Sequence, residues 1–182
     1  MIRLIIILLV SSIPLLTKAQ DTTKNLDKVI IKPQKKHGDY INDTIYQARI
    51  KKTKLDGMYI PKDLNDVFRE LNKLMDDEAK KTFMAFSDEE VDLKTHRTMG
   101  LWLEHKWSLS EGSRLSEYFR KMRVPHYDYM IGIIITSYHR HLHGKNLKLK
   151  EQVLRFRKIW NKKQKEKANN MLQTGKIKNG LD

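Results

Sequence analysis

The chain of 182 residues contains no cysteine. Disulfide bonds and thiol chemistry are therefore excluded, and no lipid can be attached to a cysteine after the first apolar run. The metalloprotease pattern H-E-x-x-H, the hydrolase pattern G-x-S-x-G and a glycine-rich phosphate loop are also missing. We expect the acidic side chains to lie mainly on outward helix faces, which disfavours the carboxylate pair of a glycosidase. An enzyme is not excluded, but no familiar pattern indicates one.

Long apolar runs are scarce as well, and the first of them lies at the N-terminus. Residues 4–16 are apolar apart from two serines and a proline; they follow Arg3 and precede small residues near Ala19. This order is typical of a secretory signal peptide and predicts cleavage between Ala19 and Gln20, giving a secreted or periplasmic protein. An uncleaved anchor is the alternative, but a membrane span needs about 20 residues. No second apolar stretch of that length follows Gln20.

Acidic residues are fewer than basic ones, and the excess of positive charge is confined to the two flanks. Residues 59–144 carry thirteen basic and fourteen acidic side chains, residues 20–58 nine and five, and residues 145–182 twelve and three. Basic surfaces favour anionic partners. We therefore expect a protein or an anionic component of the cell envelope to bind the basic arms. Nucleic acid is disfavoured, because export separates the protein from it and the lysine-rich tail has no aromatic residue.

Composition divides the chain into four parts. Residues 1–19 are the signal peptide, and residues 20–58 are predicted to be a basic irregular arm with short extended pieces near 29–31 and 41–46. Residues 59–163 have apolar side chains at helical spacing and are predicted to form an all-α domain. Residues 164–182 are polar and rich in lysine, which predicts a disordered tail.

Helix boundaries within the domain follow from caps and breaks. Pro61 suits the first position of a helix, with Asp63 and Asp66 near its positive end. A short amphipathic helix is expected over residues 77–86. Ser87 and Glu90 then form a capping box that predicts one helix to about residue 106. Its inward residues are expected to be Val91, Thr95, Met99 and Trp102.

Further helices are expected after Gly112, within the run HYDYMIGIIITSYHRHLHG of residues 126–144, and over residues 149–163. Three consecutive isoleucines in the second of these favour a strand by propensity, but helical spacing persists for more than three turns, and Gly144 suits a C-terminal cap. Because this helix is apolar most of the way round, we expect it to be the central one. The last helix is expected to direct Val153, Phe156 and Trp160 inward. The predicted fold is a compact single all-α domain of five to six short helices with a central apolar helix, flanked by irregular basic arms.

Four blocks of the domain occur in a particular order: IPKDLNDVFRELNKLM, THRTMGLWLEHKWSL, GSRLSEYF and HYDYMIGIIITSYHRHL. They resemble a bacterial domain family of unknown function, whose members read IPKDLDD, then TH, GLG and W, then W, GSRL and YF, then HPDDMSGII and SY. The likeness covers about residues 59–160 and implies a compact helical domain without an assigned chemistry. Ser108 and Ser110 stand where the pattern has Gly and Trp. Tyr127 and Tyr129 stand where it has Pro and Asp, so only Asp128 remains of a possible aspartate pair.

The polar and aromatic residues of these blocks are candidates for a binding pocket, and each also has a structural explanation. His96 is a possible base or ligand, or a histidine hydrogen-bonded within the domain. Arg114 suits a carboxylate or phosphate at a helix N-terminus, or an ion pair with Asp128 or Glu104. His126 and Asp128 suit a base with its orienting carboxylate, or a helix cap. Two tryptophans suit a ligand wall or the core. The candidate pocket is His96, Trp102, Trp107, Arg114, His126, Asp128 and Tyr138.

Three further histidines lie in the stretch SYHRHLHGK. His139 and His143 share a helix face and suit two metal ligands, whereas His141 points elsewhere. Nothing nearby in the sequence supplies a third ligand, and histidines in a last helical turn stabilise the negative helix end. We therefore predict no metal site and no cofactor.

Two functions remain. The first is a non-enzymatic binding or structural module of the cell envelope, in which the neutral domain offers a groove or face to a partner. The second is a small hydrolase or ligand-processing enzyme, which requires His96, Arg114, His126 and Asp128 to converge in one pocket. The sequence favours the first.

Overall fold

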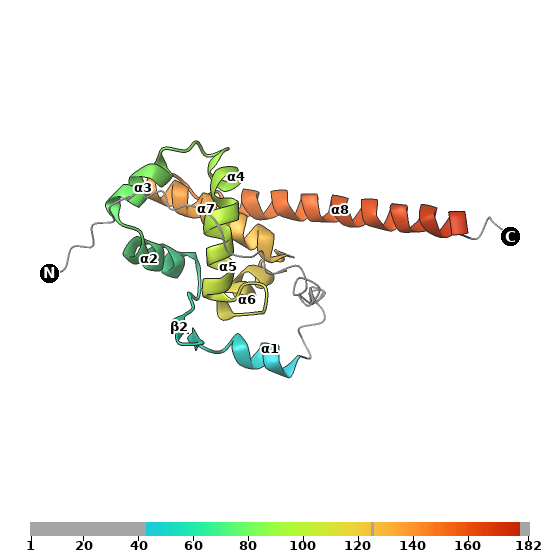
Figure 1. Cartoon of the computed structure of the whole chain (residues 1–182), viewed down its shortest axis with the longest axis horizontal. Helices are drawn as coiled ribbons and strands as arrows, with labels where there is room; N and C mark the ends of the chain where they lie inside the picture. The colour runs from blue at the N-terminus through green and yellow to red at the C-terminus, as the bar shows by residue number, and fades with distance from the viewer. Residues whose placement is uncertain (1–42, 125, 179–182) are drawn as a thin grey trace, which may run out of the picture. The chain divides into compact units, whose positions relative to one another are not determined.

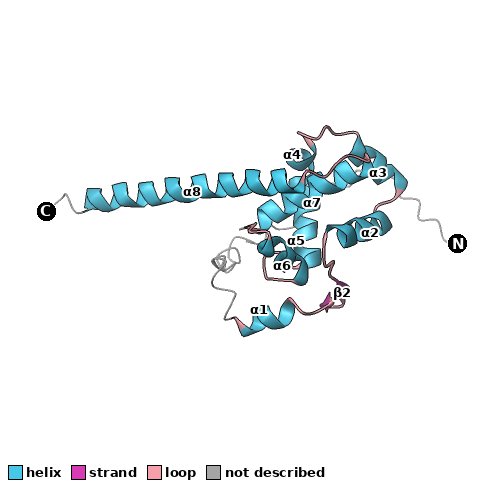
Figure 2. Cartoon of the chain, turned by 180° about the vertical axis from the view of Figure 1, so that it is seen from behind, coloured by secondary structure: helices cyan, strands magenta, loops and turns pink. Residues whose placement is uncertain are grey.

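The structure, a computed structural model, describes residues 43–124 and 126–178. The expected signal peptide of residues 1–19 and the extended piece expected near residues 29–31 lie outside the described residues. Figures 1 and 2 show helices through most of the described part. The described residues also form one two-stranded sheet. The prediction of a compact all-α domain is confirmed. In chain order the elements are α1 (Thr44–Arg49), β1 (Lys54–Leu55), β2 (Met58–Tyr59), α2 (Leu64–Leu74), α3 (Asp77–Met84), α4 (Val91–Thr95), the π-helical turn η3 (His96–Gly100), α5 (Leu101–Trp107), α6 (Arg114–Lys121), α7 (Tyr127–Leu142) and α8 (Leu149–Lys178).

The segment before the domain contains more regular structure than the sequence predicted. Residues 44–49 form α1 instead of an extended piece, because the Asp43 side chain accepts hydrogen bonds from the backbone N–H groups of Ile45 and Tyr46 and so caps the helix. Strands β1 and β2 pair antiparallel around Asp56 and Gly57, which both have positive φ, as a tight hairpin turn requires.

Helix α7 is the centre of the domain, as its apolar sequence predicted. It contacts α2, α3, α4, η3, α5, α6 and α8. Residues 130–135 of this helix are all buried. Gly144, with φ +63°, follows its C-terminal end in the expected position. Because α7 is buried along residues 130–135, it can expose polar groups only outside this stretch, and this limits where a site can form.

The expected continuous helix over residues 87–106 is interrupted by η3. A π-helical turn holds one residue more than an α-helical turn, so it rotates the following face relative to the preceding one. Val91 is buried as expected, but Trp102 is 39% exposed, and Leu103 takes the inward position in its place. Gly100 permits this crossing, since a Cβ there would lie 2.9 Å from Cγ2 of Ile131 in α7.

Helix α8 packs on α7 over its first three turns. Val153 and Phe156 are buried and Trp160 is half-buried, as the sequence predicted. The helix then continues to Lys178, past residue 163, where a disordered tail was expected to begin. Residues 161–173 are exposed, and they are mostly good helix formers without a proline or glycine. No helix in the described ranges is long and apolar enough to cross a membrane.

Gly132 in α7 provides a test of this packing. A Cβ at this position would lie 2.9 Å from Cζ of Phe156 in α8 and 3.0 Å from Oδ2 of Asp92 in α4. We expect Gly132→Ala to lower the free energy of unfolding by about 1–3 kcal/mol, measured by chemical denaturation, because a well-packed core resists an added methyl group. Asn161→Ala, in the exposed part of α8, is the control and should leave stability nearly unchanged. A Gly132→Ala variant as stable as the parent would show that the helices are less closely packed.

Candidate functional site

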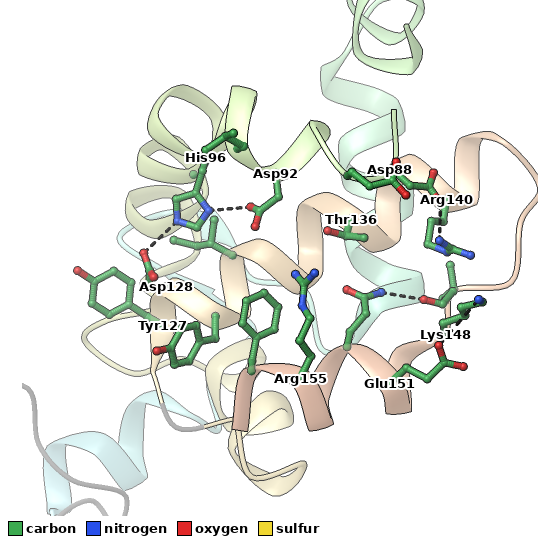
Figure 3. Close-up of a pocket in the computed structure, with 18 of the residues that line it drawn as sticks. Asp88, Asp92, His96, Tyr127, Asp128, Thr136, Arg140, Lys148, Glu151 and Arg155 are labelled. Carbon is green, nitrogen blue, oxygen red and sulfur yellow. Dashed lines mark hydrogen bonds and ion pairs between the residues drawn. The ribbon is translucent and has the colours of Figure 1, made fainter. Parts of the chain in front are cut away.

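A groove of about 860 Å³ lies over α7, between the α4–η3–α5 segment and α8. Figure 3 shows its arrangement: Asp92, His96, Tyr127 and Asp128 gather at one end, while Asp88, Arg140, Lys148 and Glu151 gather at the other. Thr136 and Arg155 lie between the two ends. The remaining walls are largely apolar, and they include Leu93, Leu101, Ile131, Leu147, Tyr129 and Phe156.

At the first end, His96 is held between two carboxylates, and we call Asp92, His96 and Asp128 the His96 clasp. His96 Nδ1 lies 2.8 Å from Oδ1 of Asp92, one helical turn earlier, and Nε2 lies 3.0 Å from Oδ1 of Asp128 in the first turn of α7. His96 is the first residue of η3, so the π-helical turn begins where the side chain must reach α7. Such turns occur often at functional positions.

The clasp fixes the protonation state of His96. The hydrogen bonds that His96 donates to Asp128 and then to Asp92 raise the pKa of His96 to about 10, although burial opposes the charge. The His96 hydrogen bond in turn lowers the pKa of Asp128. At neutral pH the imidazole is therefore a cation that donates through both nitrogens. It has no lone pair for a proton or a metal ion, so in this state it cannot act as a base or a ligand.

The other end of the groove is organised by Asp88, which we group with His139, Arg140 and Lys145 as the Asp88 cluster. Asp88 pairs with Nη1 of Arg140, lies 2.9 Å from Nζ of Lys145 and lies 3.3 Å from Nδ1 of His139. The Lys145 hydrogen bond is the main cause of the lowered pKa of Asp88. These contacts join the α3–α4 loop to the C-terminal end of α7.

The middle of the groove contains two polar groups from α8. Arg155 is exposed, and its guanidinium carbon lies 4.8 Å from the ring centroid of Phe156. Gln152 is only 8% exposed. Its Nε2 donates to Leu147 O at 2.7 Å and to Ser137 Oγ at 3.1 Å, while Oε1 is covered and accepts no hydrogen bond within the described structure. An unsatisfied buried acceptor costs about 1–3 kcal/mol.

The structure brings two of the seven candidate residues from the sequence together in the groove, namely His96 and Asp128. His126 is the N-terminal cap of α7, and its Nδ1 accepts the backbone N–H of Asp128 at 3.2 Å. Burial lowers the pKa of His126, which agrees with a neutral ring that accepts this bond. His126 is therefore the helix cap, and the carboxylate of Asp128 pairs with His96 rather than orienting His126 as a base.

Arg114 lies away from the groove. Its Nε donates to Ile60 O at 2.6 Å, its guanidinium covers the Tyr59 ring at 5.0 Å, and its acidic neighbour is Asp66, at 3.8 Å, rather than Asp128 or Glu104. It therefore joins α6 to the segment before α2. The convergence of four side chains that the hydrolase hypothesis requires is absent among these residues.

The aromatic candidates are structural. Trp107 is buried in the core, and the exposed Trp102 meets it edge to face with ring centroids 6.0 Å apart. Tyr138 is buried, and its hydroxyl donates to Oδ1 of Asn72 at 2.9 Å. None of the three lines the groove.

The three histidines at the end of α7 are used in packing. His139 Nε2 donates to Phe86 O at 2.9 Å and His143 Nε2 donates to Met84 O at 3.1 Å, so both hold the chain that follows α3. His141 stacks on Phe68 with ring centroids 4.4 Å apart. Within the described residues, no group of three His, Asp or Glu side chains is arranged to hold a metal ion.

Sequence reasoning missed Asp92, Asp88, Gln152 and Arg155. The spacing of Asp92 and His96, four residues apart on a helix, is the one local pattern that could have paired them. The others depend on contacts between α8, the α3–α4 loop and α7. Spacing within one helix does not reveal such contacts.

Residues 60–142 match a family model described as "Domain of unknown function (DUF6794)". The match confirms the resemblance of these blocks to a domain family of unknown function. No curated protein and no solved structure matches the chain. The matched residues include the His96 clasp and the floor of the groove in α7, whereas the α8 wall lies beyond them.

The His96 clasp predicts a shift that NMR can measure. We expect the His96 ring to titrate with a pKa of about 10 in the intact protein and at a clearly lower pKa in Asp128→Asn, which removes the largest cause of the shift. The pKa in this variant should stay above the ordinary value of 6.5, because Asp92 still accepts a hydrogen bond from the ring. Asp77→Asn, at a fully exposed position, is the matched control and should leave His96 unchanged. Titration of His96 near pH 6.5 in the parent protein would contradict the clasp.

The same shift predicts how stability depends on pH. A raised folded-state pKa favours folding fully below the unfolded value of 6.5, and this contribution is lost as pH rises toward about 10. The lowered pKa of Asp128 has the opposite sign, so its contribution is lost as pH falls below the ordinary value of 3.8. The difference in free energy of unfolding between the parent and His96→Gln should therefore be largest between pH 3.8 and pH 6.5.

Proposed function

We propose that this chain is an exported, non-catalytic binding module of the cell envelope, in which the groove over α7 receives a partner. The observation that supports it most is the His96 clasp. The residue that most resembles a catalytic base is a cation held by two acids, and it lies within a groove large enough for a ligand. Binding surfaces of this size commonly combine apolar walls with a few fixed polar groups.

The rim of the groove favours a partner over a fully enclosed small molecule. Leu93 and Leu101 line the groove, yet 80% and 55% of their surfaces are exposed. Large apolar side chains at the edge of a groove suit contact with another apolar surface. The charged groups of the His96 clasp are paired with one another, and so are those of the Asp88 cluster, so they shape the groove rather than react within it.

The basic arms are proposed to add attraction to an anionic envelope component. After Trp160 the exposed part of α8 carries lysines at 162, 163, 165 and 167 with a single glutamate, Glu166. Past Trp160 the exposed surface of α8 is mostly basic and polar, with Met171 and Leu172 as exposed apolar side chains near its end, so this part of the helix suits electrostatic contact at a surface. The signal peptide expected at residues 1–19 supports export.

Photo-crosslinking in the native host tests the proposal. We expect the photoreactive residue benzoylphenylalanine at position 93 or 101 to give discrete protein adducts in the cell-envelope fraction, because both positions lie at the rim of the groove. The same residue at position 45 or 74 is the control. Ile45 and Leu74 are also exposed and apolar, but neither lines the groove.

Adducts from the rim positions alone, in the envelope fraction, would support the binding module. Equal adducts from the control positions would show that exposed apolar residues stick without selectivity. Absence of rim adducts, or recovery of the protein only in the cytoplasm, would contradict the proposal.

A further inference from the structure

The centre of the groove contains a cation without an acidic partner. Arg155 points from α8 into the space between the His96 clasp and the Asp88 cluster (Figure 3). No carboxylate in the described part of the chain pairs with its guanidinium, which rests over the Phe156 ring. Three of the other cations that line the groove are engaged: His96 with Asp92 and Asp128, Arg140 with Asp88, and Lys148 with Glu151 at 3.9 Å. Arg97 also lines the groove. An anion that enters the centre of the groove would therefore meet Arg155.

One turn earlier on α8, Gln152 adds an acceptor to this cation. The orientation of its amide is fixed, because Leu147 O can only accept a hydrogen bond and so must face Nε2. Oε1 is therefore the atom left without a donor, on a side chain that is more than nine-tenths buried and lines the groove. Because Oε1 is covered in this structure, a ligand N–H would satisfy it after the side chains over it move aside. Residues three apart on a helix are neighbours, so one small ligand can reach both groups.

Apolar surface lies around these two groups. Phe156 is the next residue after Arg155, and Ile131 in α7 and Leu147 before α8 also line the groove. A ligand suited to this place has a carboxylate, an N–H close to it and an apolar side chain. These three features occur together in the last residue of a peptide and in a free N-acyl amino acid.

We propose that the centre of the groove recognises the carboxylate of an N-acylated amino acid with an apolar side chain. The carboxylate pairs with Arg155, its amide N–H donates to Oε1 of Gln152, and its side chain packs against Phe156 and Ile131. Arginine suits the first contact because its planar guanidinium can make two parallel hydrogen bonds to a carboxylate. This inference rests on the proposed function and specifies the chemistry of the partner.

Isothermal titration of the intact protein with N-acetyl-L-leucine tests this chemistry. We expect N-acetyl-L-leucinamide, which lacks the negative charge, to bind at least tenfold more weakly. The ester analogue, in which oxygen replaces the amide N–H, should also bind several-fold more weakly, because it cannot donate to Gln152. This ligand change probes the buried acceptor without disturbing the contacts that Gln152 makes to Leu147 and Ser137.

Matched variants locate the carboxylate contact. Arg155→Gln should reduce the affinity for N-acetyl-L-leucine to that for the amide, with an unchanged melting temperature because Arg155 is exposed. Arg157→Gln removes the same charge from the same helix outside the groove and should retain full affinity. Equal losses in the two variants would indicate general attraction to a basic helix and overturn the site.

Equal affinity for the acid and the amide, or no binding of either, would also overturn the carboxylate site. If rim crosslinks to a protein persist in that case, the binding module stands with a different ligand chemistry. An acetylated tripeptide that ends in leucine distinguishes the two sources of the carboxylate. Tighter binding than N-acetyl-L-leucine supports the end of a peptide chain, and equal binding supports the free N-acyl amino acid.

Discussion

The burial of α7 on every side is the constraint on which the rest of the domain depends. Residues 130–135 pack against neighbours in all directions, and glycines at 100 and 132 let two of those neighbours approach to contact distance. Since no polar group can be tolerated along this stretch without a partner, the polar constellations form where α7 begins and where it ends. The His96 clasp is at its first turn and the Asp88 cluster at its last. The groove is the space between these two ends that α4, η3 and α8 leave open.

The π-helical turn η3 allows the segment that contains it to bury residues both before and after the turn. Val91 must face the core before the turn, and Leu103 and Trp107 must face it afterwards. One additional residue in the turn satisfies both and directs His96 to Asp128, while Asp92 supports the ring from the preceding turn. The raised pKa of His96 follows from this geometry. The groove is therefore shaped by fixed charges that neutralise each other, and Arg155, from a helix outside the matched family domain, faces its open centre.

Much of the fold was predictable because it depends on local patterns. The continuous apolar spacing of α7, the inward residues of the first part of α8 and Gly144 after α7 all appear as expected. The π-helical turn was not predictable from spacing, because the residues before and after it each fit a regular helix, and only contact with α7 reveals the extra one. Helix α1 was not predicted because the spacing of apolar residues around it is only weakly helical. The helix depends on one N-cap, Asp43.

The site was predictable only in part for the same reason. His96 and Asp128 were identified as candidates, but their direct contact and the role of Asp92 depend on how η3 crosses α7. Arg114 was a reasonable candidate by chemistry, yet its Nε donates to Ile60 O and its guanidinium lies over the Tyr59 ring, away from the groove. Two histidines that resembled metal ligands instead donate to backbone carbonyls after α3. Residue type alone does not distinguish these uses.

Deletion of Thr98, an exposed residue within η3, tests most directly whether the π-helical turn creates the groove. The shortened turn should become α-helical, so that Leu103 and Trp107 keep their core positions while His96 rotates away from Asp128. NMR titration of the His96 ring should then give a pKa clearly below 10, because only the contact with Asp92 remains, in a protein that still unfolds cooperatively. A His96 ring that keeps its pKa of about 10 after the deletion would contradict the account.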